Sequence, residues 1–154
     1  MTRGTVVSIH ITDKGEAPMR SVAEARAVAG RGLEGDRYFA KEGSFSDRGG
    51  AGRDVTLIEV EAIDALERDY KTKIEPGDAR RNIVTRGVGL NHLVGQEFKV
   101  GEVTLRGVRL CEPCAHLQKL TAEKVLPGLV HRAGLRCDIL SEGIIRPGDA
   151  VTHL

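Results

Sequence analysis

The sequence is poor in aromatic residues and has no tryptophan. Aromatic side chains make up 3% of its 154 residues and hydrophobic residues as a whole 40%, so valine, isoleucine and leucine must form most of the core. No apolar run approaches the roughly 20 residues that span a membrane as a helix. The first residues also lack the apolar segment of a secretory signal peptide. We therefore expect a cytoplasmic protein without a membrane interaction.

A strong excess of charge of one sign is also missing. The formal net charge is +1, and a nucleic-acid partner is therefore not expected, because it calls for a strongly basic surface. Within this near-neutral sequence, arginines gather in a few segments. They stand at Arg26, Arg31, Arg37, Arg48 and Arg53, and again at Arg80, Arg81 and Arg86. This distribution favours a small anionic ligand over a polymer.

Cysteine is scarce, with three residues in the chain. Because the number is odd and no signal peptide is recognised, the thiols are expected to be reduced. They are then available for metal or redox chemistry, and a framework of disulfides is not expected.

Many short apolar segments, separated by turns that use the 19 glycines, indicate a mostly β structure with a few helices (α+β). The pattern predicts a single domain over residues 1–154, built as a β-barrel or a strongly bent sheet with helices packed outside. Strands are expected at residues 6–12, 55–58, 82–85, 96–100, 103–110, 135–139 and 151–153, and short helices at 90–93 and 116–126.

One clear amphipathic helix is predicted over residues 59–70. Ile58, Ala62, Leu66 and Tyr70 recur at steps of four, so they should face a core. The acidic and basic residues between them occupy the other faces. These charges are expected to form a solvated surface without a function.

Two of the arginine-bearing segments could bind an anion. Residues 30–37 contain three glycines within six positions, too many for a stable helix or a good strand, so a tight loop or an ordinary surface turn is expected. Arg80, Arg81 and Asn82 precede a predicted strand and offer fixed donors to phosphate or to a ring edge. Salt bridges from these arginines to the acidic helix explain them equally well. Residues 21–28 are ambiguous between helix and strand.

The densest reactive chemistry lies in residues 108–116, where Cys111 and Cys114 stand three positions apart and a histidine follows. A structural zinc site would use Cys111, Cys114, His116, His131 and Cys137, although the last two do not form a compact pair. A thioredoxin-like redox pair would need a βαβ pattern, which is not found. The third interpretation is a single thiolate at Cys114 that ligates a soft metal or carries sulfur, with arginines favouring its ionised form. Cys137 is expected to be a small buried hydrophobic residue inside a strand.

Five short motifs occur in one order along the chain. They are Gly32–Arg37, Arg53–Ile58, Arg80–Gly87, Leu93–Gly95 and the step Pro113–Cys114. In this order they resemble MOSC domains, the C-terminal domains of molybdenum-cofactor sulfurases and their stand-alone relatives. The resemblance covers nearly the whole chain.

The resemblance implies a mostly β, barrel-like fold that binds the pterin-based molybdenum cofactor. It also implies one cysteine that ligates molybdenum or carries sulfur, and by position this is Cys114. Cys111 is not part of the family pattern. The residues assigned to cofactor binding are Gly35, Asp36, Arg37, Arg53, Arg80, Arg81, Asn82 and His116.

The chemistry implied by the resemblance is reduction of N-oxygenated small molecules, or delivery of sulfur or cofactor. Larger relatives carry a pyridoxal-phosphate desulfurase module or an additional N-terminal barrel, for which this chain has no room. A separate reductase or cysteine desulfurase is therefore expected as a partner, with pyridoxal phosphate only on the desulfurase. A non-catalytic carrier of cofactor or sulfur and a zinc-stabilised binding module are the alternatives.

Overall fold

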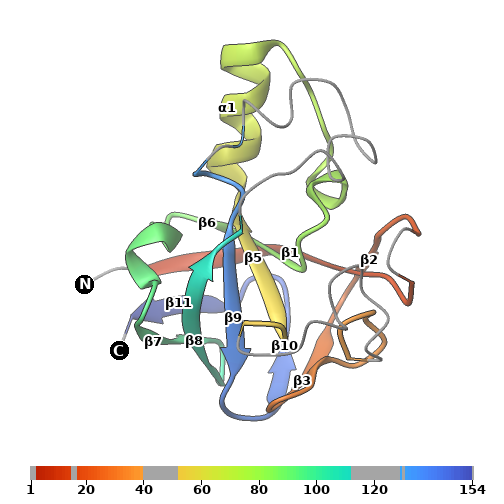
Figure 1. Cartoon of the computed structure of the whole chain (residues 1–154), viewed down its shortest axis with the longest axis vertical. Helices are drawn as coiled ribbons and strands as arrows, with labels where there is room; N and C mark the ends of the chain where they lie inside the picture. Colours follow the sequence, from red (N-terminus) through yellow and green to blue (C-terminus); the bar gives the residue numbers. More distant parts are fainter. Residues whose placement is uncertain (1–2, 15–16, 40–51, 112–128, 130, 154) are drawn as a thin grey trace.

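The computed structural model describes residues 3–14, 17–39, 52–111, 129 and 131–153 (Figure 1). The backbone of this part is mostly extended, as the sequence predicts. The strands are β1 (Arg3–Ile11), β2 (Arg20–Val22), β3 (Ala25–Val28), β4 (Gly32–Leu33), β5 (Val55–Glu59), β6 (Ile83–Arg86), β7 (Glu97–Val100), β8 (Val103–Leu110), β9 (Leu135–Ile139), β10 (Gly143–Ile145) and β11 (Ala150–His153). The helical elements are α1 (Val60–Tyr70) and the 3-10 turns η2 (Pro76–Ala79) and η3 (Leu90–Leu93).

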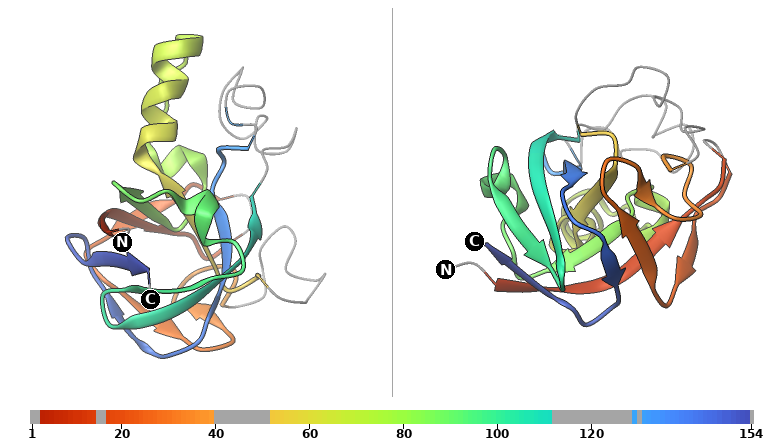
Figure 2. Two further views of the ribbon diagram at one scale, coloured as in Figure 1. Left: turned by 90° about the vertical axis from the view of Figure 1, so that its left-hand side faces the viewer. Right: turned by 90° about the horizontal axis from the view of Figure 1, so that it is seen from below.

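Seven of the described strands close into a barrel. Their order is β11, β7, β8, β9, β5, β6 and β1, and β1 pairs again with β11. Strands β5 and β6 are parallel, and the segment that contains α1 makes the crossover that a parallel pair requires. The other neighbours in the ring are antiparallel. The predicted barrel is thus confirmed, and Figure 2 (right) shows it from the end opposite α1.

Alternation along the strands decides what fills the barrel. Val55 and Leu57 of β5, and Leu135 and Cys137 of β9, are fully buried in one apolar cluster. Residues between them, such as Arg136, point to the outer face, because successive side chains of a strand alternate. The core consists mainly of valine, isoleucine and leucine, as the lack of aromatic residues requires.

Helix α1 leaves the end of β5 and stands beyond that end of the barrel (Figures 1 and 2). Its buried residues are Val60, Ala62, Ile63, Ala65 and Leu66. The helix is amphipathic as predicted, but the expectation for Tyr70 is wrong. The Tyr70 side chain is 39% exposed, because it lies in the last turn of α1, at the end of the helix that points away from the barrel (Figure 1).

The acidic start of α1 has a structural role, so the expected solvated surface without a function is wrong there. The carboxylate of Glu61 accepts a hydrogen bond from the Gly87 N–H at 2.8 Å, and that of Glu59 accepts one from the Leu90 N–H at 3.2 Å. These contacts fix the loop between β6 and η3 against the beginning of the helix.

A small second sheet was not predicted. It has the order β10, β3, β4, and it takes up part of the ambiguous residues 21–28. Gly32 and Leu33 pair with Val28 and Ala27, so part of the glycine-rich segment does form a short strand. The expected helix at 116–126 lies outside the described residues.

Neither α1 nor any other helix in the described part of the chain is long and apolar enough to cross a membrane.

Candidate functional site

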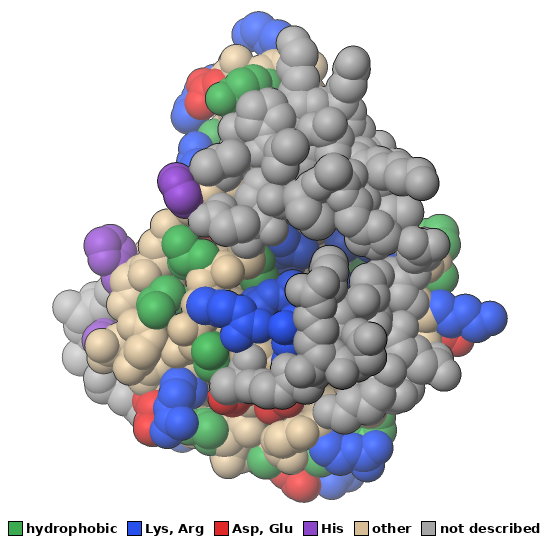
Figure 3. All heavy atoms as spheres, in the orientation of Figure 1, with side chains coloured by type: hydrophobic (Ala, Val, Ile, Leu, Met, Phe, Trp, Pro, Cys, Tyr) green, Lys and Arg blue, Asp and Glu red, His purple; other side chains and the backbone are tan. Residues whose placement is uncertain are grey.

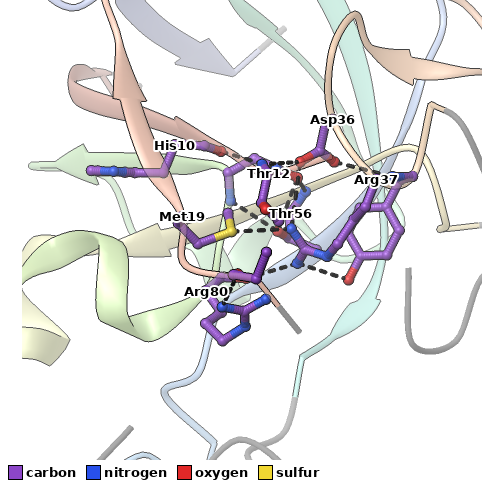
Figure 4. Close-up of polar contacts among 10 residues, drawn as sticks. His10, Thr12, Met19, Asp36, Arg37, Thr56 and Arg80 are labelled. Atoms are coloured by element: carbon purple, nitrogen blue, oxygen red, sulfur yellow. Dashed lines mark hydrogen bonds and ion pairs between the residues drawn. The ribbon is translucent and has the colours of Figure 1, made fainter. Parts of the chain in front are cut away.

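The loop after β4 is held by the carboxylate of Asp36. Gly35 has φ +86°, a conformation that favours glycine, and places Asp36 in the interior with 1% exposure. The Asp36 carboxylate accepts the N–H of Thr12 at 3.2 Å and that of Tyr38 at 3.3 Å. The loop is thereby tied to the end of β1, as Figure 4 shows for Thr12 and Asp36.

Arg37 links this loop to the segment before β6. It is 3% exposed and forms an ion pair with Asp36 at 3.4 Å. Its Nη2 donates to the carbonyl oxygen of Arg80 at 3.2 Å and to the Tyr38 hydroxyl, also at 3.2 Å (Figure 4). Two motifs that are far apart in the sequence therefore meet at one guanidinium group.

The two arginines before β6 are also largely buried. Arg80 adopts φ +60° at the end of η2, and its Nη1 donates to the carbonyl oxygen of Ala17 at 2.8 Å. Arg81 donates through Nε to the carbonyl oxygen of Ala133 at 2.7 Å. The contacts named here run to backbone carbonyl groups, and they orient both side chains firmly.

Asn82 and Thr56 lock the start of β6 to β5. Asn82 is fully buried, and its Oδ1 accepts the N–H of Thr56 at 3.1 Å. Its Nδ2 donates to the carbonyl oxygen of His10 at 3.1 Å, and its own N–H donates to the Thr56 hydroxyl at 3.0 Å. Asn82, which follows Arg80 and Arg81 in the sequence, therefore joins β1, β5 and β6.

Replacing Thr56 by valine should lower the free energy of unfolding by about 1–2 kcal/mol, because the buried Asn82 N–H and Oδ1 both lose the hydroxyl partner while the volume hardly changes. Urea unfolding measures the loss. Thr5→Val, at an exposed position of β1, is the matched control and should change stability little. Equal effects of the two substitutions would contradict the locking role.

Arg136 of β9 and Arg109 of β8 lie directly opposite each other on adjacent strands of the barrel wall. Their Cα atoms are paired, and Thr56 of β5 pairs with Arg136 on the other side. Regular alternation from Val103 and Leu105 would point Arg109 inward, but a bulge between Gly107 and Arg109 shifts the register. Arg109 therefore shares the outer face with Arg136. Like charges directly opposite each other are destabilising.

Tyr38 lies among three of these arginines. Its side chain is buried, and the Arg37 guanidinium lies over its ring, 4.3 Å from the centroid. Burial by itself would raise the pKa of the Tyr38 phenol, but the nearby positive charges of Arg37, Arg136 and Arg81 hold that pKa below its ordinary value. The electrostatic potential at the phenol is thus positive. We refer to Arg37, Arg81, Arg136 and Tyr38 as the arginine cluster.

One donor of the arginine cluster has no acceptor among the described residues. Within the part of the chain that the structure describes, Nη1 of Arg136 is buried and without a hydrogen-bond partner. A buried charged donor without an acceptor is costly. Figure 3 shows Lys and Arg side chains gathered at the centre of one face of the molecule. An anion with several oxygen atoms would satisfy both the donor and the charge.

The predicted site residues divide into three groups. Gly35, Asp36, Arg37, Arg80, Arg81 and Asn82 come together around the cluster, by the contacts given above. Arg53 lies just before β5 and is partly buried. The contacts given above for the cluster are made by other residues. Cys114 and His116 lie outside the described residues.

Sequence reasoning missed Tyr38, Arg136, Arg109 and Thr56. Tyr38 follows Arg37 directly, so its place could have been suspected. Arg136 was recognised only as the polar neighbour of inward residues in a strand, and its outward position was the available signal. Nothing in the local pattern reveals Arg109, because the bulge depends on pairing with β9.

The other cysteines are buried. Cys137 has no exposed surface and faces the barrel core as predicted. Burial, together with nearby Cys111, Asp138 and Asp54, raises the pKa of its thiol well above the ordinary value, so it is a poor nucleophile. Cys111 is 2% exposed, and its N–H donates to the Gly134 carbonyl oxygen at 2.8 Å.

Among the described residues, no group of three or more His, Cys, Asp or Glu side chains could hold a metal ion.

Comparison with protein families places this geometry in a known context. The family model described as "MOSC domain" matches residues 45–152, which is more than half of the chain. The chain belongs to the MOSC domain family. No curated protein sequence matches it.

Solved structures share the fold of this MOSC protein at low sequence identity. The YuaD protein from Bacillus subtilis superposes with a TM-score of 0.81 at 14% identity, over 97% of this chain and 94% of that chain. YiiM from Geobacillus stearothermophilus gives 0.72 at 17% identity, covering 98% and 75% of the two chains. YiiM from Escherichia coli gives 0.66 at 17% identity, covering 100% and 70%. At these identities the likeness establishes the fold.

Proposed function

We propose that this MOSC protein binds the molybdenum cofactor in the cytoplasm, with the arginine cluster holding the cofactor phosphate and Cys114 ligating the metal. The bound cofactor would then reduce N-oxygenated small molecules, with electrons from a separate reductase. The observation that carries the proposal is the buried Nη1 of Arg136, which lies within a group of arginines and has no hydrogen-bond partner in the described part of the chain.

The chemistry of the donor set fits a phosphate ester. Arg136 and Arg81 contribute charge, and the only carboxylate paired with the cluster in the described residues is Asp36, whose partner is Arg37. Arginine guanidinium groups match phosphate oxygens in geometry and in charge. An anion that lies between or beside Arg109 and Arg136 would reduce the repulsion between these two opposed positive charges.

Cys114 follows Cys111 by three positions in the sequence, and three residues of chain span at most about 11 Å. Cys111 comes directly after β8, two residues beyond Arg109. The sequence therefore attaches the proposed thiolate ligand to the strand end that carries the arginines. Thiolates are preferred ligands of soft transition metals. When bound, the cofactor would supply the redox chemistry, while the chain's own residues bind and orient it.

Changing Cys114 to serine should reduce the molybdenum content of the purified protein by about tenfold or more, because the proposed metal–thiolate bond is removed. The measurement is elemental analysis, together with pterin fluorescence after oxidation, on protein made in a host that synthesises the cofactor. Cys137→Ser is the control, and it should lower stability through its buried position while the remaining folded protein keeps its metal. The opposite ranking would refute the assignment of Cys114. About one zinc per protein that is retained when Cys114 is replaced, but lost when Cys111 and Cys137 are replaced, would favour the zinc-stabilised module.

Turnover distinguishes an enzyme from a carrier. Molybdenum-loaded protein given an artificial electron donor and an N-hydroxylated small molecule should reduce it. Stable loading without turnover would contradict the proposed reductase activity and favour a carrier of cofactor or sulfur, for which a cysteine desulfurase is the expected partner.

A further inference from the structure

The Tyr38 hydroxyl is the second donor of the arginine cluster for which the described residues offer no acceptor. Its oxygen accepts a hydrogen bond from Arg37 Nη2 at 3.2 Å. In the described part of the chain, no group accepts the phenolic hydrogen, and the neighbouring Arg136 Nη1 is equally without an acceptor. Two neighbouring buried donors, one phenolic and one guanidinium, therefore both lack an acceptor among the described residues. Tyrosine hydroxyl groups usually find a partner when they are buried.

We propose that Tyr38 is a direct ligand of the bound oxyanion, donating its hydroxyl hydrogen to one oxygen while Arg136 Nη1 donates to another. The inference rests on the proposed function, in which the oxyanion is a phosphate group. It assigns to Tyr38 a binding role that its position after Arg37 does not by itself imply.

The contacts of Tyr38 explain why its hydroxyl would point at an anion. Its backbone N–H is fixed by the Asp36 carboxylate at 3.3 Å, and its ring lies under the Arg37 guanidinium. The ring therefore has little freedom to turn away, and the hydroxyl oxygen is kept as an acceptor for the guanidinium hydrogens. Since that oxygen already accepts, its remaining capacity is to donate, and a phosphate oxygen is an acceptor only.

An anion at this place should reverse the electrostatic effect of the arginines on Tyr38. Arg37 from its own loop, Arg81 from the segment before β6 and Arg136 from β9 stabilise the phenolate. A neighbouring oxyanion that accepts the phenolic hydrogen opposes ionisation, because it repels the phenolate and hydrogen-bonds to the neutral form. The pKa of Tyr38 should therefore rise when the oxyanion binds.

The composition of the chain makes this measurable. There are two tyrosines and no tryptophan, so a full-length Tyr70→Phe protein reports Tyr38 alone through the near-ultraviolet absorbance of tyrosinate. Tyr70 is 39% exposed at the end of α1, away from the cluster. Without phosphate, the titration midpoint should lie below the value of about 10 for free tyrosine. Inorganic phosphate should raise it by about one unit, while potassium chloride at the same ionic strength should not.

Variants identify the ligand. Tyr38→Phe should weaken phosphate binding, measured by calorimetry, about 5- to 10-fold through loss of one hydrogen bond. Arg136→Gln should abolish the phosphate-dependent shift of Tyr38. Arg106→Gln, whose guanidinium is half exposed and pairs with Glu97, should retain the shift.

The outcomes separate this inference from the proposed function. Phosphate that binds without moving the Tyr38 titration, and equally well to Tyr38→Phe, overturns the role of Tyr38 and leaves the cofactor proposal standing. A shift that depends on Arg136, in protein that never retains molybdenum, supports Tyr38 as an oxyanion ligand and overturns the molybdenum assignment. Absence of phosphate binding to the unmodified protein overturns both.

Discussion

Changing Arg136 to glutamine should weaken binding of the phosphate-bearing cofactor about 10- to 100-fold. The substitution removes a partly buried charge and a charge-assisted hydrogen bond to the anion, together worth about 1.5–3 kcal/mol. The molybdenum and pterin content of the purified protein should fall accordingly, and the affinity for inorganic phosphate should fall with it. Arg106→Gln, at an exposed position of the neighbouring strand β8, is the matched control and should bind as the unmodified protein does.

The same substitution should not destabilise the cofactor-free protein. It removes a buried donor that has no acceptor among the described residues, and one of two opposed positive charges. Unfolding in urea should therefore show no loss of stability and a gain of up to about 1 kcal/mol. A residue kept only for structure would behave in the opposite way. Clear destabilisation with unchanged phosphate affinity would show that Arg136 supports the fold and does not form a binding site.

The largest effect on stability is expected for Gly134→Ala. Gly134 has φ +112°, and a Cβ atom there would overlap the carbonyl oxygen of Leu57. Backbone strain and the displacement of β5 from β9 should together cost about 3–5 kcal/mol, which leaves little of the stability of an ordinary domain. Differential scanning calorimetry, or the yield of soluble protein if it does not fold, measures the effect.

Gly30→Ala provides the control. Gly30 also has a positive φ, +73°, but no atom lies within 4 Å of the position of its Cβ. The substitution should therefore cost only the backbone term, about 1–2 kcal/mol. Similar losses at both positions would mean that strain alone matters and that contact with Leu57 does not. Any folded Gly134→Ala protein should also bind phosphate poorly, since Ala133 and Gly134 hold Arg81 and the backbone of Cys111.

Much of the fold could be predicted from sequence. Alternation of apolar and polar residues identified β1, β8 and β9, and the four-residue repeat identified α1. The short apolar segment at residues 55–58 identified β5. What the sequence did not reveal is the small second sheet, because its strands have two to four residues and take their stability from pairing with distant segments. Local pattern carries little information about so short a strand.

The candidate site was only partly predictable. Arg37, Arg80 and Arg81 could be selected because arginines near glycine-rich turns suggest an anion. Their neighbours Arg136 and Tyr38 could not be selected with the same reasoning. Arg136 lies inside a strand, where an outward charged residue is ordinary, and Tyr38 carries no charge that would indicate an anion. The proposed thiolate ligand, Cys114, stays a prediction from sequence.

The sequence by itself determined which side chains are available. Val, Ile and Leu in alternating positions can fill a barrel, and arginines clustered in a few segments favour a small anionic ligand. The tertiary structure alone decided which arginines meet. Arg109 would point inward if β8 alternated regularly, and only the register shift against β9 turns it to the outer face beside Arg136. Strand register is set by long-range pairing and by packing of the whole barrel, so no local pattern encodes it.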